Sequence, residues 1–194
     1  MSDFFLELYS EEIPHGLQIS ARSQLHNLIL KELNENNIEF KNFNIYSTPK
    51  RLVVLIENIT LKQILKSQEV KGPKVGCNEE SLNGFLRSRS AEKQDLIKKD
   101  TEKGEFYFIK LPETDLLTSD ILKKKLPSIL QSINWKKSMR WSDYDCFWGR
   151  PLKSILCLLD NKVLDFHFYH IHSSNITFVN GPYEDKEIKV NNFN

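Results

Sequence analysis

The segment Phe4-Phe-Leu-Glu-Leu-Tyr-Ser-Glu-Glu-Ile-Pro14 determines how the fold begins. Its first six residues are apolar except for Glu7, and Ser10 ends the run, so a short buried strand is predicted. Pro14 separates this strand from residues 17–33, in which apolar positions recur with helical spacing. The sequence therefore predicts a β-strand that is followed directly by an amphipathic helix.

Further elements are predicted outward from this segment by the periodicities of strands and helices. Thr48-Pro49 separates the strands of a hairpin-like pair, and Asp160-Asn161-Lys162 is a polar loop typical of a second hairpin. The C-terminal residues 171–194 are polar, and we expect them to be poorly ordered. The predicted strands lie at 43–46, 52–59, 69–71, 106–111, 152–159 and 163–168, and the predicted helices at 79–89, 91–99 and 116–130, the last kinked or divided by Pro127.

These elements together predict an α+β fold, with antiparallel-rich sheets and flanking helices in two small lobes. The expected division is an N-terminal lobe at residues 1–100, a second lobe with the C-terminal hairpin at 101–180, and a tail at 181–194. The 194 residues are 40% hydrophobic and 27% charged, a composition that supports a buried core.

Charge and cysteine content narrow the classes of function. Lys and Arg number 27 against 26 Asp and Glu, so nucleic-acid binding requires a local basic patch. The widely separated Cys77, Cys146 and Cys157 favour neither a disulfide framework nor a metal site. The N-terminus lacks a signal-peptide pattern, and no apolar run is long enough to span a bilayer. We therefore expect a cytoplasmic protein with no membrane partner.

Two groups of side chains suggest acid-base or metal chemistry. Glu11 and Glu12 are adjacent carboxylates, but acids after a strand more often cap the next helix. His167, His170 and His172 lie close in sequence, yet in one continuous strand His167 would point away from the other two. We therefore predict no catalytic residue and no metal site, and the chain has no phosphate-binding glycine motif.

Cations and aromatic residues are concentrated between residues 135 and 150. Cations pair with phosphates and flat rings stack on unpaired bases, which is the combination that RNA-binding surfaces use. The alternative, which composition alone favours, is that the tryptophans are buried and the lysines form a solvated rim. The candidate RNA contacts are Lys136, Lys137, Arg140, Trp141 and Arg150, followed by Lys50, Arg51, Lys71 and Lys74.

Six short stretches, in order and at compatible spacing, resemble the N-terminal region of bacterial glycyl-tRNA synthetase β subunits. The stretches are FLELYSEEIP at 5–14, STPKRLVV at 47–54, VKGP at 70–73, KGEFY at 103–107, WKKSMRW at 135–141 and RP at 150–151. The resemblance covers residues 4–177, and the β subunits of this family continue well beyond that region.

The resemblance implies a division of labour. In that family the α subunit resembles a class II synthetase core, and it forms the adenylate and transfers glycine with ATP and Mg2+. The β subunit is implied to bind and orient tRNA(Gly) and to hold an α2β2 assembly together. This chain is thus expected to be the N-terminal region of a glycine–tRNA ligase β subunit that binds no cofactor and is catalytically inactive alone.

Two other functions stay open at this point. The chain could be an assembly scaffold that docks on the α subunit and never contacts RNA. The histidine cluster would instead support a free-standing hydrolase or metal enzyme.

Overall fold

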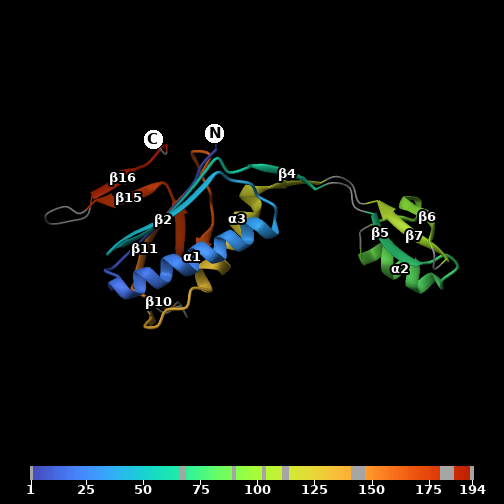
Figure 1. Ribbon diagram of the computed structural model, residues 1–194, viewed down its shortest axis with the longest axis horizontal. Helices are drawn as coiled ribbons and strands as arrows, with labels where there is room; N and C mark the ends of the chain where they lie inside the picture. The colour runs from blue at the N-terminus through green and yellow to red at the C-terminus, as the bar shows by residue number, and fades with distance from the viewer. Residues whose placement is uncertain are drawn as a thin grey trace. The chain divides into compact units, whose positions relative to one another are not determined.

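The chain forms two compact units in a computed structural model (Figure 1). Unit 1 comprises Met1–Gln63 and Leu117–Asn194, and unit 2 is the intervening segment Ile64–Leu116. Both units combine helices with mainly antiparallel strands, which confirms the predicted α+β class. The structure describes residues 2–65, 69–88, 91–101, 104–110, 114–140, 147–179 and 186–192.

Unit 1 is built around a seven-stranded sheet with its first strand near the centre. The strands are β1 (Phe4–Ser10), β2 (Asn42–Thr48), β3 (Arg51–Glu57), β11 (Leu152–Leu159), β12 (Lys162–Val163), β13 (His167–Phe168) and β14 (Ile171–Ser174). Their order is β13-β14-β11-β1-β3-β2, with β12 paired to β11. All these pairs are antiparallel except β11 with β14. The predicted first strand and the two predicted hairpins thus meet in one sheet.

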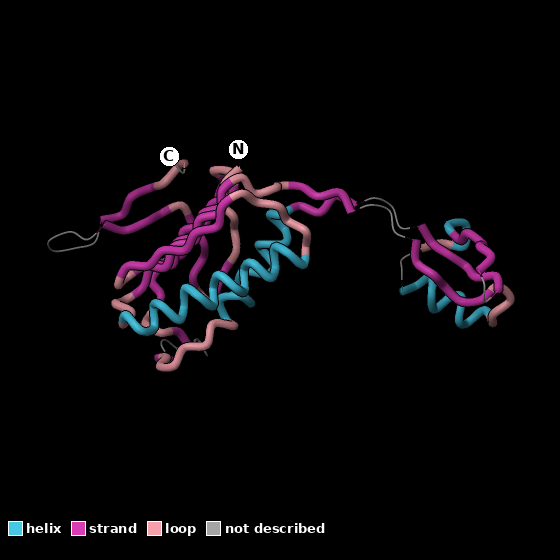
Figure 2. Tube along the Cα trace, viewed as in Figure 1, coloured by secondary structure: helices cyan, strands magenta, loops and turns pink. Residues whose placement is uncertain are grey.

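One face of this sheet is covered by α1 (His15–Glu35) and α3 (Thr118–Gln131), which lie on the same side of the strands in Figure 2. The two helices contact each other, and Lys125 Nζ of α3 lies 2.9 Å from Glu32 Oε1 of α1. The hydrogen bond to Glu32 and its negative charge raise the pKa of Lys125. The buried side of α1 repeats every four residues, as helical spacing predicts, and consists of Leu17, Ala21, Leu25, Ile29 and Leu33.

The opposite face of the sheet carries a C-terminal hairpin formed by β15 (Ile176–Val179) and β16 (Lys186–Lys189). Phe178 of β15 stacks on Tyr9 of β1, with ring centroids 5.4 Å apart. The expectation of a poorly ordered C-terminus is therefore wrong for β14, β15 and β16. These polar segments form strands because they pair with each other or with β11, and because β15 packs on β1.

Two other sequence expectations differ from the structure. Of the two outcomes expected for Pro127, a kink or a division of the helix, division is wrong, because buried Leu126 and Ile129 hold α3 against the core on both sides of the proline. The helix expected at residues 91–99 is replaced by a short 3-10 turn, η1 (Lys93–Asp95), and a strand, β6 (Leu96–Thr101). Pairing of all six residues of β6 with a neighbouring strand outweighs their local helical pattern.

Unit 2 is a three-stranded antiparallel sheet with one helix packed on it. Its strands are β5 (Glu69–Lys74), β7 (Gly104–Lys110) and β6, in the order β5-β7-β6, and its helix is α2 (Glu79–Ser88). Gly72 permits the close approach of α2, because an added Cβ would lie 2.5 Å from Phe85 Cε1. Leu86 of α2 and Ile109 of β7 are buried, which marks the covered face of this sheet.

The chain passes between the units through two paired strands, β4 (Lys62–Leu65) and β8 (Thr114–Leu117). At their unit 1 ends, the Thr118 backbone N–H donates to the Leu61 carbonyl over 2.9 Å. Unit 2 is therefore an insertion, which differs from the expected division into residues 1–100 and 101–180. Composition does not change where the insertion begins and ends, so only the pairing of distant strands places these boundaries.

Burial keeps the thiol of one cysteine protonated. Cys157 in β11 is 0% exposed, and burial raises the pKa of its thiol well above its ordinary value. Cys77 is partly exposed, and Cys146 lies outside the described residues.

Among the helices of the described part of the chain, none is long and apolar enough to cross a bilayer.

Candidate nucleic-acid interface

The basic segment that comes after α3 forms a small hairpin in unit 1. β9 (Met139–Arg140) pairs with β10 (Phe147–Trp148), with Met139 opposite Trp148. Met139 and Phe147 are 47% and 57% exposed, whereas Trp148 is 1% exposed. Phe147 is a surface aromatic that the sequence reasoning missed. The signal was present, since the neighbour of a buried residue in a strand points to the other face.

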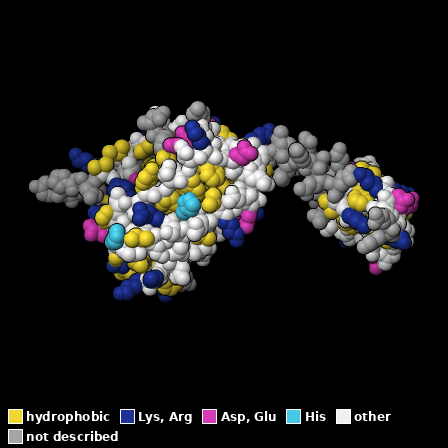
Figure 3. All heavy atoms as spheres, in the orientation of Figure 1, with side chains coloured by type: hydrophobic (Ala, Val, Ile, Leu, Met, Phe, Trp, Pro, Cys, Tyr) yellow, Lys and Arg dark blue, Asp and Glu magenta, His cyan; other side chains and the backbone are white. Residues whose placement is uncertain are grey.

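Three of the candidate cations are exposed on this hairpin or next to it. The side chains of Lys136, Lys137 and Arg140 all face solvent. Among the described residues, neither Lys136 nor Lys137 forms an ion pair. Figure 3 shows Lys and Arg side chains beside hydrophobic ones at the place that β10 occupies in Figure 1. This surface therefore offers positive charge next to an exposed ring.

The tryptophans of this region form its core and not its surface. Trp135 and Trp148 are 9% and 1% exposed, and their ring centroids lie 5.0 Å apart. Trp148 also contacts Phe168, at 5.6 Å between ring centroids. An added Cβ at Gly149 would lie 2.4 Å from Trp135 Cε3, so the ring packs directly on this backbone. The alternative of buried tryptophans is confirmed for these two, while Trp141 lies outside the described residues.

Arg150 and Lys50 are brought to the same end of the central sheet. The Ser10 N–H donates to the Lys50 carbonyl over 2.9 Å, and the Glu11 N–H donates to the Pro151 carbonyl over 3.0 Å. Both cations are half-buried, and Arg150 Nη1 donates to the Gly149 carbonyl over 3.1 Å. Segments 5–14, 47–54 and 150–151, which are far apart in sequence, therefore converge at the end of β1.

Arg51 lies beside Lys50 but is engaged inside the fold. Its Nε is 3.2 Å from Glu7 Oε2, and the two side chains are 21% and 9% exposed. Its guanidinium also lies 4.6 Å from the centroid of the Tyr9 ring and donates to the Phe178 carbonyl. Thr177 Oγ1 donates to the other Glu7 oxygen over 2.5 Å. Arg51 thus neutralises a buried carboxylate, and little of it is left for a ligand.

Lys71 and Lys74 belong to unit 2, where both are exposed on β5. Lys71 Nζ lies 3.6 Å from the centroid of the Phe106 ring. The candidate cations therefore fall into two sets, one in each unit.

The histidines are arranged differently from the expectation of one continuous strand. A turn at Tyr169 and His170 separates β13 from β14, so His167 and His172 are cross-strand partners on one face. Their ring centroids are 5.9 Å apart. Within the described part of the chain, no three His, Cys, Asp or Glu side chains are grouped closely enough to hold a metal ion.

Glu11 and Glu12 do not cap a helix. α1 begins at His15 after Pro14, has no acidic residue in its first turn and has no side-chain cap. The capping interpretation is therefore wrong, because both acids lie before the proline. Glu11 instead forms an ion pair with Lys153, at 2.7 Å between Oε1 and Nζ.

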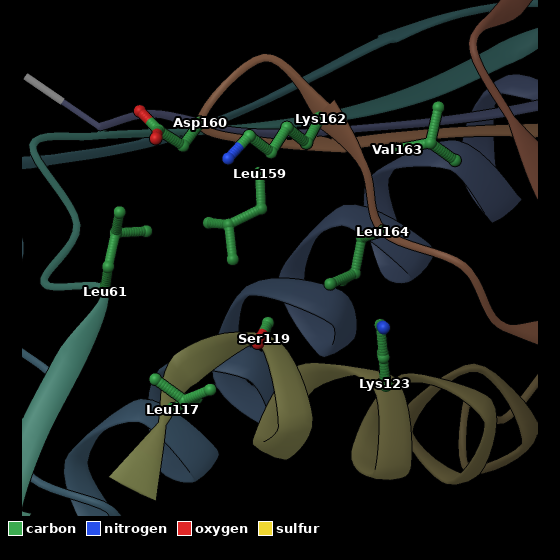
Figure 4. Close-up of a pocket in the computed structure, with 9 residues that line it drawn as sticks. All are labelled: Leu61, Leu117, Ser119, Lys123, Leu159, Asp160, Lys162, Val163 and Leu164. Carbon is green, nitrogen blue, oxygen red and sulfur yellow. The ribbon is translucent and has the colours of Figure 1, made fainter. Parts of the chain in front are cut away.

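A hollow of about 300 Å3 lies between α3 and the β11–β12 turn. Figure 4 shows Leu159 and Leu164 reaching from the strand side toward Ser119 on α3. Lys123, Lys162 and Asp160 are its charged lining residues. A mainly apolar lining with dispersed charges suits packing of an apolar group better than acid-base chemistry.

The whole chain is similar to one family of known proteins. The family described as glycyl-tRNA synthetase beta subunit matches residues 4–194. The glycine–tRNA ligase beta subunit of Rickettsia canadensis is 32% identical over 193 residues, which cover 100% of this chain and 29% of that protein. The beta subunit of Paracoccus denitrificans is 36% identical over 162 residues, which cover 84% of this chain and 24% of that protein.

A third relative gives the same picture. The glycine–tRNA ligase beta subunit of Syntrophotalea carbinolica is 34% identical over 184 residues, which cover 91% of this chain and 27% of that protein. The chain thus spans between 24% and 29% of the length of these relatives.

Proposed function

Because the chain belongs to the glycyl-tRNA synthetase beta subunit family, we propose that it helps to bind and position tRNA(Gly) for charging with glycine. In this proposal it acts in the cytoplasm as part of an α2β2 glycine–tRNA ligase. The α subunit carries out adenylate formation and glycyl transfer. The present chain contributes RNA-binding surface and contacts that hold the assembly together.

The observation that carries the proposal is the exposed basic hairpin of unit 1. Lys136, Lys137 and Arg140 face solvent, and Arg140 is the register partner of the exposed Phe147. Cations on an exposed surface can displace the counterions of a nucleic-acid backbone. The buried Trp135 and Trp148 hold this segment in place, so the charges are presented from a fixed base.

The chemistry of ATP activation is assigned to the α subunit, with its ATP and Mg2+. Binding of these groups needs oxygen ligands for Mg2+ and a cradle of donors for the phosphates. The described part of this chain offers no three-residue metal group, and its sequence lacks a phosphate-binding glycine motif.

The purified chain alone is expected to give no ATP–pyrophosphate exchange with glycine, because the exchange requires the adenylate-forming centre of the α subunit. Addition of the α subunit to the same assay is the positive control. Exchange by the 194-residue chain alone would contradict this division of labour.

The double variant Lys136→Ala/Arg140→Ala is expected to bind tRNA(Gly) about tenfold more weakly at low salt, because two phosphate contacts are lost. The dependence of log K on log salt should become shallower by about 2. Filter binding over a salt series measures both quantities. The matched control is Lys41→Ala/Lys124→Ala, which removes the same charge from exposed positions beside β2 and on α3 and should bind like the parent.

A scaffold function without RNA contact is the second candidate, and the exposed Met139 and Phe147 favour it, since exposed apolar groups also dock proteins. It predicts equal tRNA affinity for the Lys136/Arg140 variant and the parent. It also predicts that Phe147→Ser weakens co-purification with the α subunit and leaves the tRNA affinity unchanged. The two measurements therefore separate the candidates.

A further inference from the structure

The face of the unit 2 sheet that lies opposite α2 has aromatic residues at its centre. Residues alternate between faces along a strand, so Phe106 and Phe108 of β7 share a face, and Ile109 lies on the other. Ile109 is 2% exposed, whereas both phenylalanines are partly exposed. Gly72 is packed under Phe85 of α2, which places its neighbour Lys71 on the aromatic face as well.

Lysines of the two outer strands flank these rings. Lys71 of β5 is the register partner of Phe108, and Lys99 of β6 is the register partner of Phe106. Lys71 Nζ lies 3.6 Å from the Phe106 centroid, and Lys99 Nζ lies 5.8 Å from the Phe108 centroid. We call Lys71, Lys99, Phe106 and Phe108 the aromatic-lysine platform.

Two acidic residues of β6 and β7 lie on the face opposite the platform. Asp100 and Glu105 are register partners of each other and point to the face that carries Ile109. Lys74 is paired with Phe106 and extends its stem toward Gly104, on the platform side. Residues 64–116 contain as many acidic as basic residues, and Lys71, Lys74 and Lys99 are the lysines placed around the two rings by the strand register.

From this geometry we propose that the aromatic-lysine platform binds single-stranded RNA. Unpaired bases stack on Phe106 and Phe108, and the phosphates pair with Lys71, Lys74 and Lys99. Two residues along a strand are about 6.8 Å apart, so each ring takes one base. A flat sheet with central rings and peripheral cations suits stacked single strands, because every base has a flat face while a duplex hides it.

Charge favours RNA over an apolar protein surface as the occupant. Covering the platform with an apolar surface would strip water from the Lys71 ammonium group without supplying a counter-charge, which is costly. A phosphate backbone supplies that counter-charge. Lys71 lies over the Phe106 ring in the free protein, and its flexible stem lets the ammonium exchange the ring for a phosphate as a base enters.

The platform goes beyond the interface proposed in unit 1, because its residues belong to unit 2. Either site can bind RNA if the other does not. The two assignments are therefore tested with separate variants and separate probes.

The test is fluorescence anisotropy of the whole chain with a short labelled single-stranded RNA of mixed sequence, and with the same strand annealed to its complement. Phe106→Leu/Phe108→Leu keeps apolar bulk but removes the rings. It is expected to weaken single-strand binding about tenfold to hundredfold. The matched control Phe106→Tyr/Phe108→Tyr keeps both rings and should stay within about twofold of the parent. The parent should bind the duplex more weakly than the single strand.

Salt dependence distinguishes stacking from charge. Lys71→Gln/Lys99→Gln should make the log K against log salt slope shallower by about 1.4, because each phosphate contact on a single strand contributes about 0.7. The leucine variant should leave this slope unchanged. Dispersed amide resonances in a 15N–1H spectrum verify that each variant keeps unit 2 folded, and the lysine pair provides the test if the leucine pair does not fold.

Equal single-strand affinity of the leucine variant and the parent would overturn the platform. Equal affinity of the parent for duplex and single strand would overturn it too, as would an unchanged slope of log K against log salt in the variant Lys71→Gln/Lys99→Gln. Each of these results leaves a protein as the better occupant of this face. The Lys136→Ala/Arg140→Ala variant should still bind the short single strand on the platform. Its loss of tRNA affinity alone would therefore support the unit 1 interface and say nothing against the platform, so the failures are distinguishable.

Discussion

Arg51→Met is expected to lower the free energy of unfolding by about 3 kcal/mol, because it leaves a buried carboxylate without its cation. Glu7 lies in the central strand β1 with its side chain 9% exposed, and Arg51 Nε is 3.2 Å from its Oε2. Methionine keeps the length and apolar contacts of the stem, so charge is the main change. Urea unfolding followed by tryptophan fluorescence measures the effect in unit 1, since residues 64–116 contain no tryptophan.

Lys50→Met is the matched control, because it removes a neighbouring cation that has no such partner among the described ion pairs. It should change the free energy of unfolding by less than about 0.5 kcal/mol. In the double variant Glu7→Gln/Arg51→Met no buried charge remains, and Thr177 keeps its acceptor. We expect it to recover more than about half of the loss. Equal effects of Arg51→Met and Lys50→Met would return Arg51 to the RNA-binding candidates.

Trp148→Ala is expected to lower the free energy of unfolding by about 4 kcal/mol, because it opens a large cavity in the core under the basic hairpin. Trp148 is 1% exposed, and its ring contacts Trp135 and Phe168 at centroid distances of 5.0 and 5.6 Å. The same urea titration, followed by far-UV circular dichroism, measures the loss. The tRNA affinity of the folded variant should fall as well, since the hairpin loses its support.

Trp148→Phe is the control for this cavity. It keeps an aromatic ring in the site and removes the Nε1 hydrogen, which has no hydrogen-bond partner among the described residues. We expect its cost to be below about 2 kcal/mol. An alanine variant that costs less than about 1 kcal/mol would show that Trp148 is not part of the core.

The parts of the fold that the sequence predicts best are those with strong local patterns. The apolar run of β1, the four-residue spacing of α1 and the hairpin around Pro49 are all found where the sequence predicts them. Strand β6 was missed because its residues carry no alternating apolar pattern, and β15 because its alternation, Ile176-Thr177-Phe178, is only three residues long. They form strands through pairing with β7 and β16, which local reasoning cannot detect.

The candidate site shows a similar limit. Composition located the exposed cations 136–140 and placed Arg51 behind them, but it gave no sign that Arg51 is engaged inside the fold. The Arg51 guanidinium donates hydrogen bonds to Glu7, 44 positions away, and to the Phe178 carbonyl, 127 positions away. These bonds hold the side chain against the fold. Only the register of β1 with β3 and the packing of β15 bring these groups together. The aromatic face of β7 was hidden for a related reason, since both faces of that strand look apolar in sequence.

The paired strands β4 and β8 have a consequence for how this protein can change. Leu61 and Thr118 are hydrogen-bonded neighbours where the insertion leaves unit 1. The packing of the unit 1 core therefore does not depend on the length of the chain inserted between them. Doubling the inserted chain costs only about 0.6 kcal/mol in closure entropy. Unit 2 can therefore become longer or shorter, or be replaced, during evolution. Substitutions on its surface need not alter the sheet of unit 1.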